Sequence, residues 1–146
     1  MVSRLTINND AIAEEYFADA QLLGIQCSME PHSFIWVINK RFLYNFRYVT
    51  GAEIIVSNKQ RKFSFPVFQC KETNLHLVHL LYANQHDGEY LLPELKHFDF
   101  IWMLKGETDG VELSELILKE LKNIPDVQLV AFLAADKVKN KTQLVM

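Results

Sequence analysis

The sequence predicts an α+β fold, a two-layer sandwich in which a mainly antiparallel sheet is covered by two helices. Apolar residues recur at helical spacing in two segments, at about residues 31–43 and 110–122. The other segments are short apolar or alternating runs joined by short turns, as in antiparallel sheets. Each helix lies between two strands, which gives two β-α-β-like units and leaves a ferredoxin-like arrangement open.

Length and composition indicate a single domain. The chain has 146 residues, of which 49% are hydrophobic and 23% are charged, a balance typical of a well-packed globule. No repeat, low-complexity tract or Gly/Ser linker divides it. We therefore expect one domain over residues 1–146, with a lysine-rich C-terminal tail from about residue 136.

The first elements follow from local signals. Residues 4–8 alternate polar and apolar side chains and predict a short strand, whereas residues 9–19 fit either a short helix or the approach to the next strand. That next strand is predicted over residues 20–27. Pro31 suits the first turn of a helix, because its missing N–H would be unpaired there in any case.

The middle of the chain reads as consecutive extended segments. Pro66 interrupts one of them and indicates an edge position or a bulge, because proline cannot donate to a strand ladder. The Asp87-Gly88 pair predicts a turn. The extended segments are predicted at residues 45–49, 52–57, 63–68, 74–83 and 98–105, with a polar hairpin tip at residues 58–62.

The last third predicts a helix and a strand. Asp109 is placed to cap the helix, with Glu112 reaching back in a capping-box arrangement. Pro125 ends the helix, and residues 127–133 predict a final buried strand. The apolar stripe of the helix is predicted at Leu113, Leu116, Ile117 and Leu121.

Charge and cysteine usage exclude several classes of function. A formal net charge of −3 argues against nucleic-acid binding, which normally needs a basic face; basic turn residues Lys59, Arg61 and Lys62 leave a weaker RNA-associated alternative. No apolar span is long enough for a membrane. Cys27 and Cys70 are far apart and fit two free thiols in a reducing cytoplasm.

The polar turn at Glu94, His97 and Asp99 is the best candidate for a binding site. Two carboxylates beside a histidine suit acid–base chemistry or a divalent cation. A structural interpretation is simpler and is preferred: Pro93 sets the turn, Glu94 accepts backbone N–H groups, and Asp99 caps the loop or faces solvent.

Other chemistry-bearing residues carry no recognisable pattern. His76 and His79 would point to opposite faces of a strand, so each is interpreted as a separate surface or core histidine. No serine lies in a nucleophile elbow, and the glycines form no phosphate loop. The sequence therefore predicts no catalytic residue, no metal site and no cofactor.

Three ordered motifs resemble the bacterial IPExxxDY family of small proteins. The signature falls on Leu92-Pro93-Glu94 and Asp99-Phe100, with Leu for Ile and Phe for Tyr, and with four residues between Glu94 and Asp99. Residues 34–48 and 124–145 are also similar to the family. The resemblance brings no established activity, cofactor or substrate.

The leading functional hypothesis is a cytoplasmic, non-enzymatic interaction domain that self-associates. It depends on the large apolar fraction, the expected strand edges and the lack of a catalytic constellation. The alternatives are a small-ligand-binding protein or enzyme that uses Glu94, His97 and Asp99, and, more weakly, the RNA-associated module.

Overall fold

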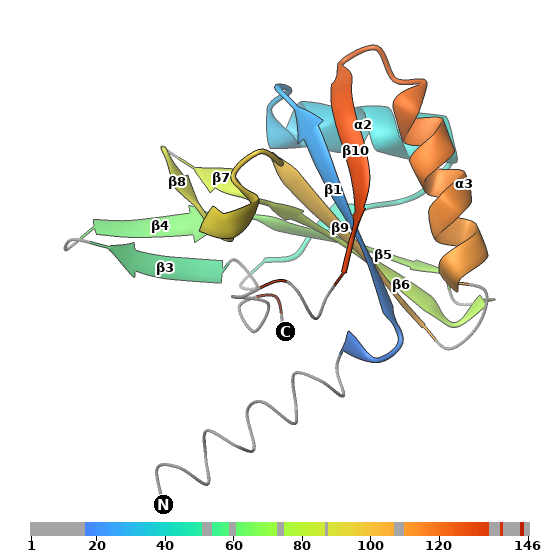
Figure 1. The fold of residues 1–146 in the computed structure, drawn as a ribbon, viewed down its shortest axis with the longest axis horizontal. Helices are drawn as coiled ribbons and strands as arrows, with labels where there is room; N and C mark the ends of the chain where they lie inside the picture. Colours follow the sequence, from blue (N-terminus) through green and yellow to red (C-terminus); the bar gives the residue numbers. More distant parts are fainter. Residues whose placement is uncertain are drawn as a thin grey trace, which may run out of the picture.

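Six strands form one antiparallel sheet, and two helices lie against one of its faces (Figure 1). The computed structural model describes residues 17–50, 54–58, 61–72, 75–86, 88–106 and 110–134, together with Val138 and Leu144. The predicted strand at residues 4–8 and the Asp109 cap lie outside these residues, as does most of segment 9–19. The predicted α+β two-layer sandwich is confirmed.

The elements follow the predicted order closely. The helices are α2 (Pro31–Phe42) and α3 (Gly110–Lys122), and a short 3-10 turn, η2, spans Pro93–Leu95. The strands are β1 (Ala20–Cys27), β2 (Arg47–Tyr48), β3 (Ile54–Asn58), β4 (Arg61–Phe65), β5 (Val67–Glu72), β6 (Leu77–Ala83), β7 (Gln85–His86), β8 (Glu89–Tyr90), β9 (Phe100–Gly106) and β10 (Val127–Leu133).

The main sheet has the strand order β10-β1-β9-β6-β5-β2, and β3–β4 and β7–β8 form two separate hairpins. Every neighbouring pair of strands in the main sheet is antiparallel. It follows that β9 and β10 run parallel on either side of β1, with α3 joining them. This is a split β-α-β unit, as in ferredoxin-like folds. The second unit, β1-α2-β2, carries the chain across three strands to the opposite edge.

Both faces of the sheet are covered. The helix face packs Phe34 and Ile38 of α2 and Ile117 of α3 against Trp102 and other core residues. The opposite face packs against β4 and against Val138 and Leu144, both buried. The Tyr82 hydroxyl donates a 2.7 Å hydrogen bond to the Leu144 carbonyl. Residues near the C-terminus therefore return to the sheet.

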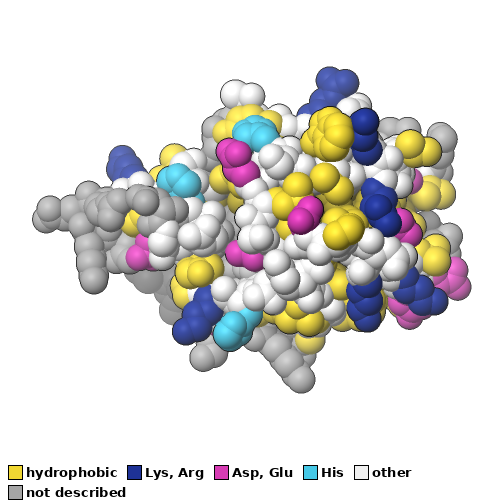
Figure 2. Space-filling view, turned by 90° about the horizontal axis from the view of Figure 1, so that it is seen from above, with side chains coloured by type: hydrophobic (Ala, Val, Ile, Leu, Met, Phe, Trp, Pro, Cys, Tyr) yellow, Lys and Arg dark blue, Asp and Glu magenta, His cyan; other side chains and the backbone are white. Residues whose placement is uncertain are grey.

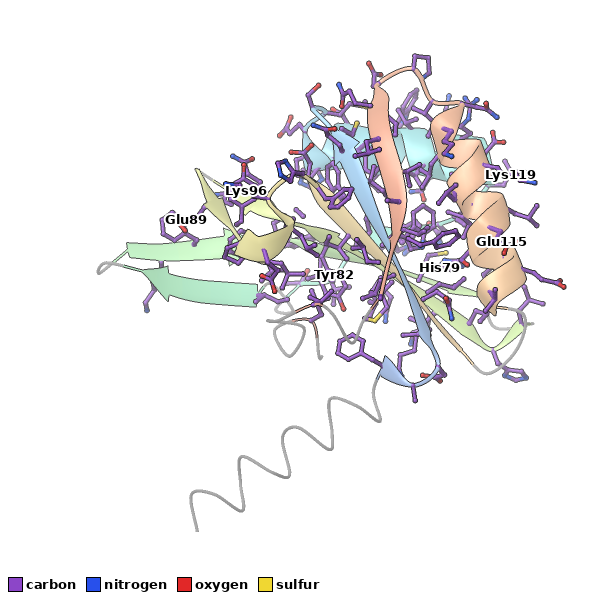
Figure 3. The ribbon with its side chains drawn as sticks, in the orientation of Figure 1. His79, Tyr82, Glu89, Lys96, Glu115 and Lys119 are labelled. Carbon is purple, nitrogen blue, oxygen red and sulfur yellow. The ribbon has the colours of Figure 1, made fainter. Side chains whose placement is uncertain are left out.

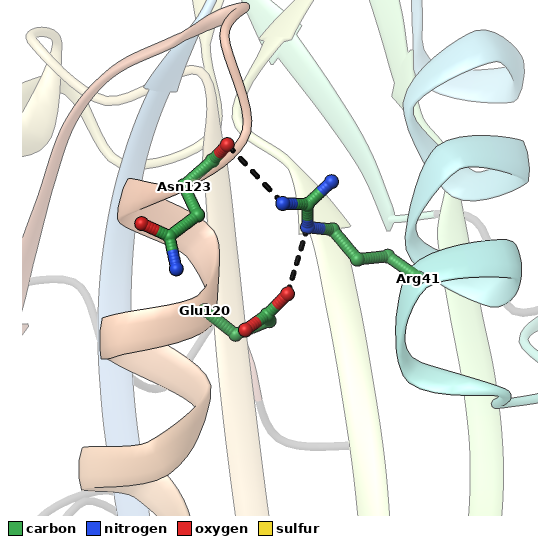
Figure 4. A network of polar contacts seen from close by, with 3 residues as sticks. All are labelled: Arg41, Glu120 and Asn123. Atoms are coloured by element: carbon green, nitrogen blue, oxygen red, sulfur yellow. Dashed lines mark hydrogen bonds and ion pairs between the residues drawn. The ribbon is translucent and has the colours of Figure 1, made fainter.

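An arginine fixes the two helices to each other (Figure 4). Arg41, in the last turn of α2, donates through Nε to Glu120 Oε1 at 2.9 Å and through Nη2 to the Asn123 carbonyl at 3.2 Å. Because both contacts are exposed to solvent, their contribution to stability is small, about 1 kcal/mol or less. They link the end of α2 to the end of α3 and add little to the stability of the fold.

Three local predictions were wrong. Leu116 of α3 is 61% exposed and the stripe that faces the sheet includes Ser114, which is 1% exposed and donates to the Val111 carbonyl. The segment 63–68 is divided at Pro66 into β4 and β5, because proline has no N–H for a ladder. Strand β10 was predicted to be buried, but it is an edge strand in which Val130 is the one buried residue.

Candidate functional site

The predicted site turn is organised by Asn84, a residue that the sequence did not single out. Its side chain is fully buried. Nδ2 donates to the carbonyls of Leu95 at 3.0 Å and Phe98 at 2.9 Å, and Oδ1 accepts from the Leu92 amide at 2.8 Å. The backbone of Asn84 also bonds Leu91 and Asp99. One asparagine thus holds both ends of the turn that leads into β9.

The three predicted site residues have different surroundings. Asp99 Oδ2 accepts the Cys27 amide at 2.8 Å, and the Asp99 amide donates to the Ile25 carbonyl at 2.8 Å, so this carboxylate ties the start of β9 to the end of β1. Glu94 is half-buried and His97 is exposed. A hollow of about 70 Å³ beside Asp99 is lined by neither Glu94 nor His97. A joint site at the three residues stays a prediction.

A second polar cluster lies on the helix face of the sheet, where His79 is fully buried (Figure 3). Trp102 Nε1 donates to His79 Nδ1 at 3.1 Å, and His79 Nε2 lies 2.5 Å from Glu72 Oε1. Because an indole N–H can only donate, Nδ1 must accept, and the ring proton is on Nε2 and points to the carboxylate. The cluster therefore fixes one tautomer of a neutral histidine.

Tyr44, in the loop that follows α2, packs against this cluster. Its ring centroid lies 4.6 Å from that of His79, and its hydroxyl hydrogen-bonds Glu72. The loop is held in turn by Asn39, which exchanges hydrogen bonds of 2.8 and 3.1 Å with the backbone of Phe46. Helix α2 thereby positions the aromatic cover over the buried histidine.

Burial controls the protonation of this cluster. Burial lowers the pKa of His79, although the Glu72 carboxylate opposes this shift. The pKa of the Tyr44 phenol is raised, mainly by burial and secondly by the negative charge of Glu72. Burial also raises the pKa of the Cys70 thiol, the cross-strand partner of His79. Both ring nitrogens of His79 are occupied. The arrangement suits a structural role, and the prediction of separate histidines is confirmed by a buried His79 and an exposed His76.

The lowered pKa predicts that stability falls as the pH drops. The unfolded chain takes up a proton at His79 near its ordinary pKa of 6.5, and the folded chain does so at a lower pH. Between these values the unfolded state binds more protons, so the free energy of unfolding decreases as the pH falls through the ordinary histidine pKa of 6.5. Urea unfolding at several pH values measures this decrease.

The exposed histidine His97 provides the control for this experiment. His97→Gln is expected to retain the pH dependence of the parent protein, whereas His79→Phe is expected to flatten it. Equal pH dependence in the parent protein and in His79→Phe would contradict the assignment of the effect to the buried ring.

The described residues contain no group of three or more His, Cys, Asp and Glu side chains that could hold a metal ion. Cys27 and Cys70 are both buried and free. None of the described helices is long and apolar enough to cross a membrane.

The free edge of the sheet is the most distinctive surface feature. Strand β10 pairs with β1 and, among the described residues, with no other strand. Leu129 is 46% exposed and Phe132 is 50% exposed. Seen from above, apolar side chains lie between acidic and basic ones on the surface (Figure 2). Both apolar side chains lie on a strand edge at which another strand can add.

No protein-family model and no curated protein matches the chain. The resemblance of Leu92-Pro93-Glu94 and Asp99-Phe100 to the IPExxxDY family stays a prediction from its motifs.

Proposed function

We propose that the protein is a cytoplasmic, non-enzymatic interaction domain that self-associates by pairing β10 with β10 of a second copy. The observation that carries this proposal is the chemistry of the β10 edge. Its seven residues, Val127–Leu133, include no charged residue and no proline. Natural proteins usually protect a sheet edge with lysine, proline, a bulge or a very short strand.

The opposite edge of the same sheet is protected in that way. Strand β2 has two residues, Arg47 and Tyr48, and one of them is charged. The contrast within one sheet favours a role for β10 as a docking edge. The β1–β10 register shifts between Gln26 and Cys27, which leaves Gln128 as an extra residue near the start of β10; the five register pairs from Leu22–Leu133 to Gln26–Leu129 are regular.

A second copy fits this edge better than an unrelated strand because an antiparallel pair is self-complementary. A two-fold axis at Val130, in the regular part of β10, would set Leu129 opposite Ala131, and no like charges would face each other because β10 has no charged residue. Leu129 and Phe132 project from opposite faces of the sheet. Both apolar side chains would then be covered when the two sheets join into one.

Introducing a charge on the edge tests this proposal. Leu129→Lys is expected to weaken dimerisation by about tenfold or more, because two lysines would face the joint near its axis and lose hydration. Sedimentation velocity over a concentration series measures the change. The matched control is Leu116→Lys, which replaces another exposed leucine, on α3, and is expected to leave the dimer intact.

Two outcomes would contradict self-association at β10. One is a parent protein that stays monomeric up to about 100 μM, well above the range of specific dimers. The other is a dimer that the two lysine substitutions weaken equally.

The alternative functions have less support. The hollow beside Asp99, about 70 Å³, is well below the roughly 300–1,000 Å³ of usual ligand sites. An RNA-associated module would depend on Lys59, Arg61 and Lys62, and the side chains of the first two lie outside the described part of the chain.

A further inference from the structure

A separate hollow of about 470 Å³ lies where β2 meets β5, at the sheet edge opposite β10. This volume is within the range of ligand sites for small molecules. The lining residues are Asn45, Arg47, Tyr48, Val49, Thr50, Gln69, Cys70 and Lys71. The proposed dimer contact does not involve any of them.

The lining of this hollow is cationic. Arg47 and Lys71 contribute two positive charges, and no Asp or Glu is among the lining residues. The whole chain, in contrast, has a net charge of −3. A concave surface of one sign concentrates counter-ions of the other sign, even on a protein whose net charge is opposite. The hollow therefore favours an anion.

The register of the strands sets the charged groups beside a neutral donor. Arg47 is the cross-strand partner of Gln69, so the two side chains lie on the same face of the sheet. Lys71 is two residues further along β5 and projects from that face as well. A guanidinium, an amide and an ammonium group are thus placed in a row at the edge.

Neighbouring groups supply further donors, and the adjacent acidic residue Glu72 projects from the other face of β5, where it bonds His79. Arg47 Nε makes a long 3.4 Å contact with Asn45 Oδ1, and the two terminal nitrogens of a guanidinium can hold an oxyanion end-on. Thr50 adds a hydroxyl to the lining. Cys70 stays neutral, because burial raises the pKa of its thiol.

We propose that this hollow binds a phosphate group through Arg47 and Lys71, with Gln69 and Thr50 as neutral donors. Two cations match the two negative charges of a phosphate or a phosphomonoester better than the single charge of a carboxylate. The volume exceeds what the phosphate alone needs and leaves room for a small organic group. The ligand class is therefore a free phosphate or a small phosphomonoester.

Nuclear magnetic resonance titration tests the proposal. Inorganic phosphate and glycerol phosphate are added separately to ¹⁵N-labelled protein at constant ionic strength, with chloride as the balancing anion. Saturable shifts are expected at the amides of Arg47, Thr50, Gln69 and Lys71. Tighter binding of glycerol phosphate would identify an ester ligand, and tighter binding of inorganic phosphate would identify the free ion; both support the proposal.

A pair of double variants separates a site from general electrostatics. Arg47→Gln with Lys71→Gln is expected to weaken phosphate binding by about tenfold or more, because two charge-assisted contacts are lost. Lys40→Gln with Lys119→Gln removes the same charge from exposed positions on α2 and α3 and is expected to leave binding unchanged.

A conservative single variant provides a test that does not depend on the double variant of Arg47 and Lys71 folding correctly. Arg47→Lys keeps the charge and removes the planar donor fork, so it is expected to bind phosphate more weakly than the parent protein and more tightly than the double variant. Shifts that do not saturate, or equal weakening in the two double variants, would overturn the proposal.

Discussion

Replacing Asn84 with alanine is expected to lower the free energy of unfolding by about 3 kcal/mol, one of the largest effects of a single substitution in this chain. The amide side chain is fully buried and makes three hydrogen bonds to the backbone of the turn at residues 92–98. Alanine would leave one N–H and two carbonyl groups without these partners. A buried polar group without a partner costs about 1–3 kcal/mol.

A second variant, Asn84→Asp, tests the two hydrogen bonds that the side-chain amide donates. Aspartate keeps the acceptor for the Leu92 amide, but its second oxygen would face the carbonyls of Leu95 and Phe98, which can only accept. We expect this variant to be at least as unstable as Asn84→Ala at neutral pH and to recover part of its stability in acid, where the protonated carboxyl can donate to one carbonyl.

The control for both variants is Asn123→Ala. Asn123 is exposed, and its contact with Arg41 uses the backbone carbonyl, which alanine retains. We expect a change of about 0.5 kcal/mol or less in the free energy of unfolding measured with urea.

Hydrogen exchange provides a second measurement: exchange of the Leu92 amide should be faster in Asn84→Ala than in the parent protein. A loss below about 1 kcal/mol in Asn84→Ala would show that the turn is held by other contacts.

The helices and most strands could be predicted because their signals are local. Residues 20–27 were predicted as a strand and form β1 with the same bounds. Pro31 begins α2, and the turn next to Asp87 has Gly88 at a positive φ of 84°, which glycine adopts without strain. In each case the neighbouring residues alone decide the conformation.

The position of a strand within the sheet could not be predicted in the same way. The sequence of β10 is as apolar as a central strand, yet among the described strands it pairs with β1 alone and so lies at the edge. Burial of Ser114 in place of Leu116 has a similar origin, since it depends on how α3 is rotated against the sheet. Both features are properties of the tertiary arrangement.

The buried polar groups were the least predictable part. His79, Glu72 and Trp102 come from three strands, and their contacts depend on the register of those strands. Asn84 reads as an ordinary turn residue beside Gln85, although its partners lie 8–14 residues further along the chain. A single sequence carries no signal for such long-range hydrogen bonds.

Trp102→Phe is the second substitution with a large expected effect, a loss of about 2–3 kcal/mol in the free energy of unfolding. Trp102 is fully buried, and its ring packs edge-on against Phe42, Phe46 and His79. Phenylalanine is smaller and leaves a cavity. It also removes the N–H that pairs with His79 Nδ1, so a buried acceptor loses its partner.

Trp36→Phe provides the matched control, because the second tryptophan is 61% exposed and its ring contacts Lys40. We expect a change within about 0.5 kcal/mol. The two tryptophan variants make the same chemical change at a buried and an exposed site. Equal losses would contradict the importance of the cluster around His79.

The ¹⁵N shifts of the His79 ring distinguish lost packing from a lost hydrogen bond. In the parent protein they should report a proton on Nε2, since Trp102 occupies Nδ1. In Trp102→Phe the preference for this tautomer should weaken, because only Glu72 still orients the ring. A coupling energy of about 1–2 kcal/mol is expected in a double-mutant cycle of Trp102→Phe with His79→Phe. Coupling near zero would show that the cavity accounts for the whole loss of stability in Trp102→Phe and that the hydrogen bond between Trp102 and His79 does not contribute.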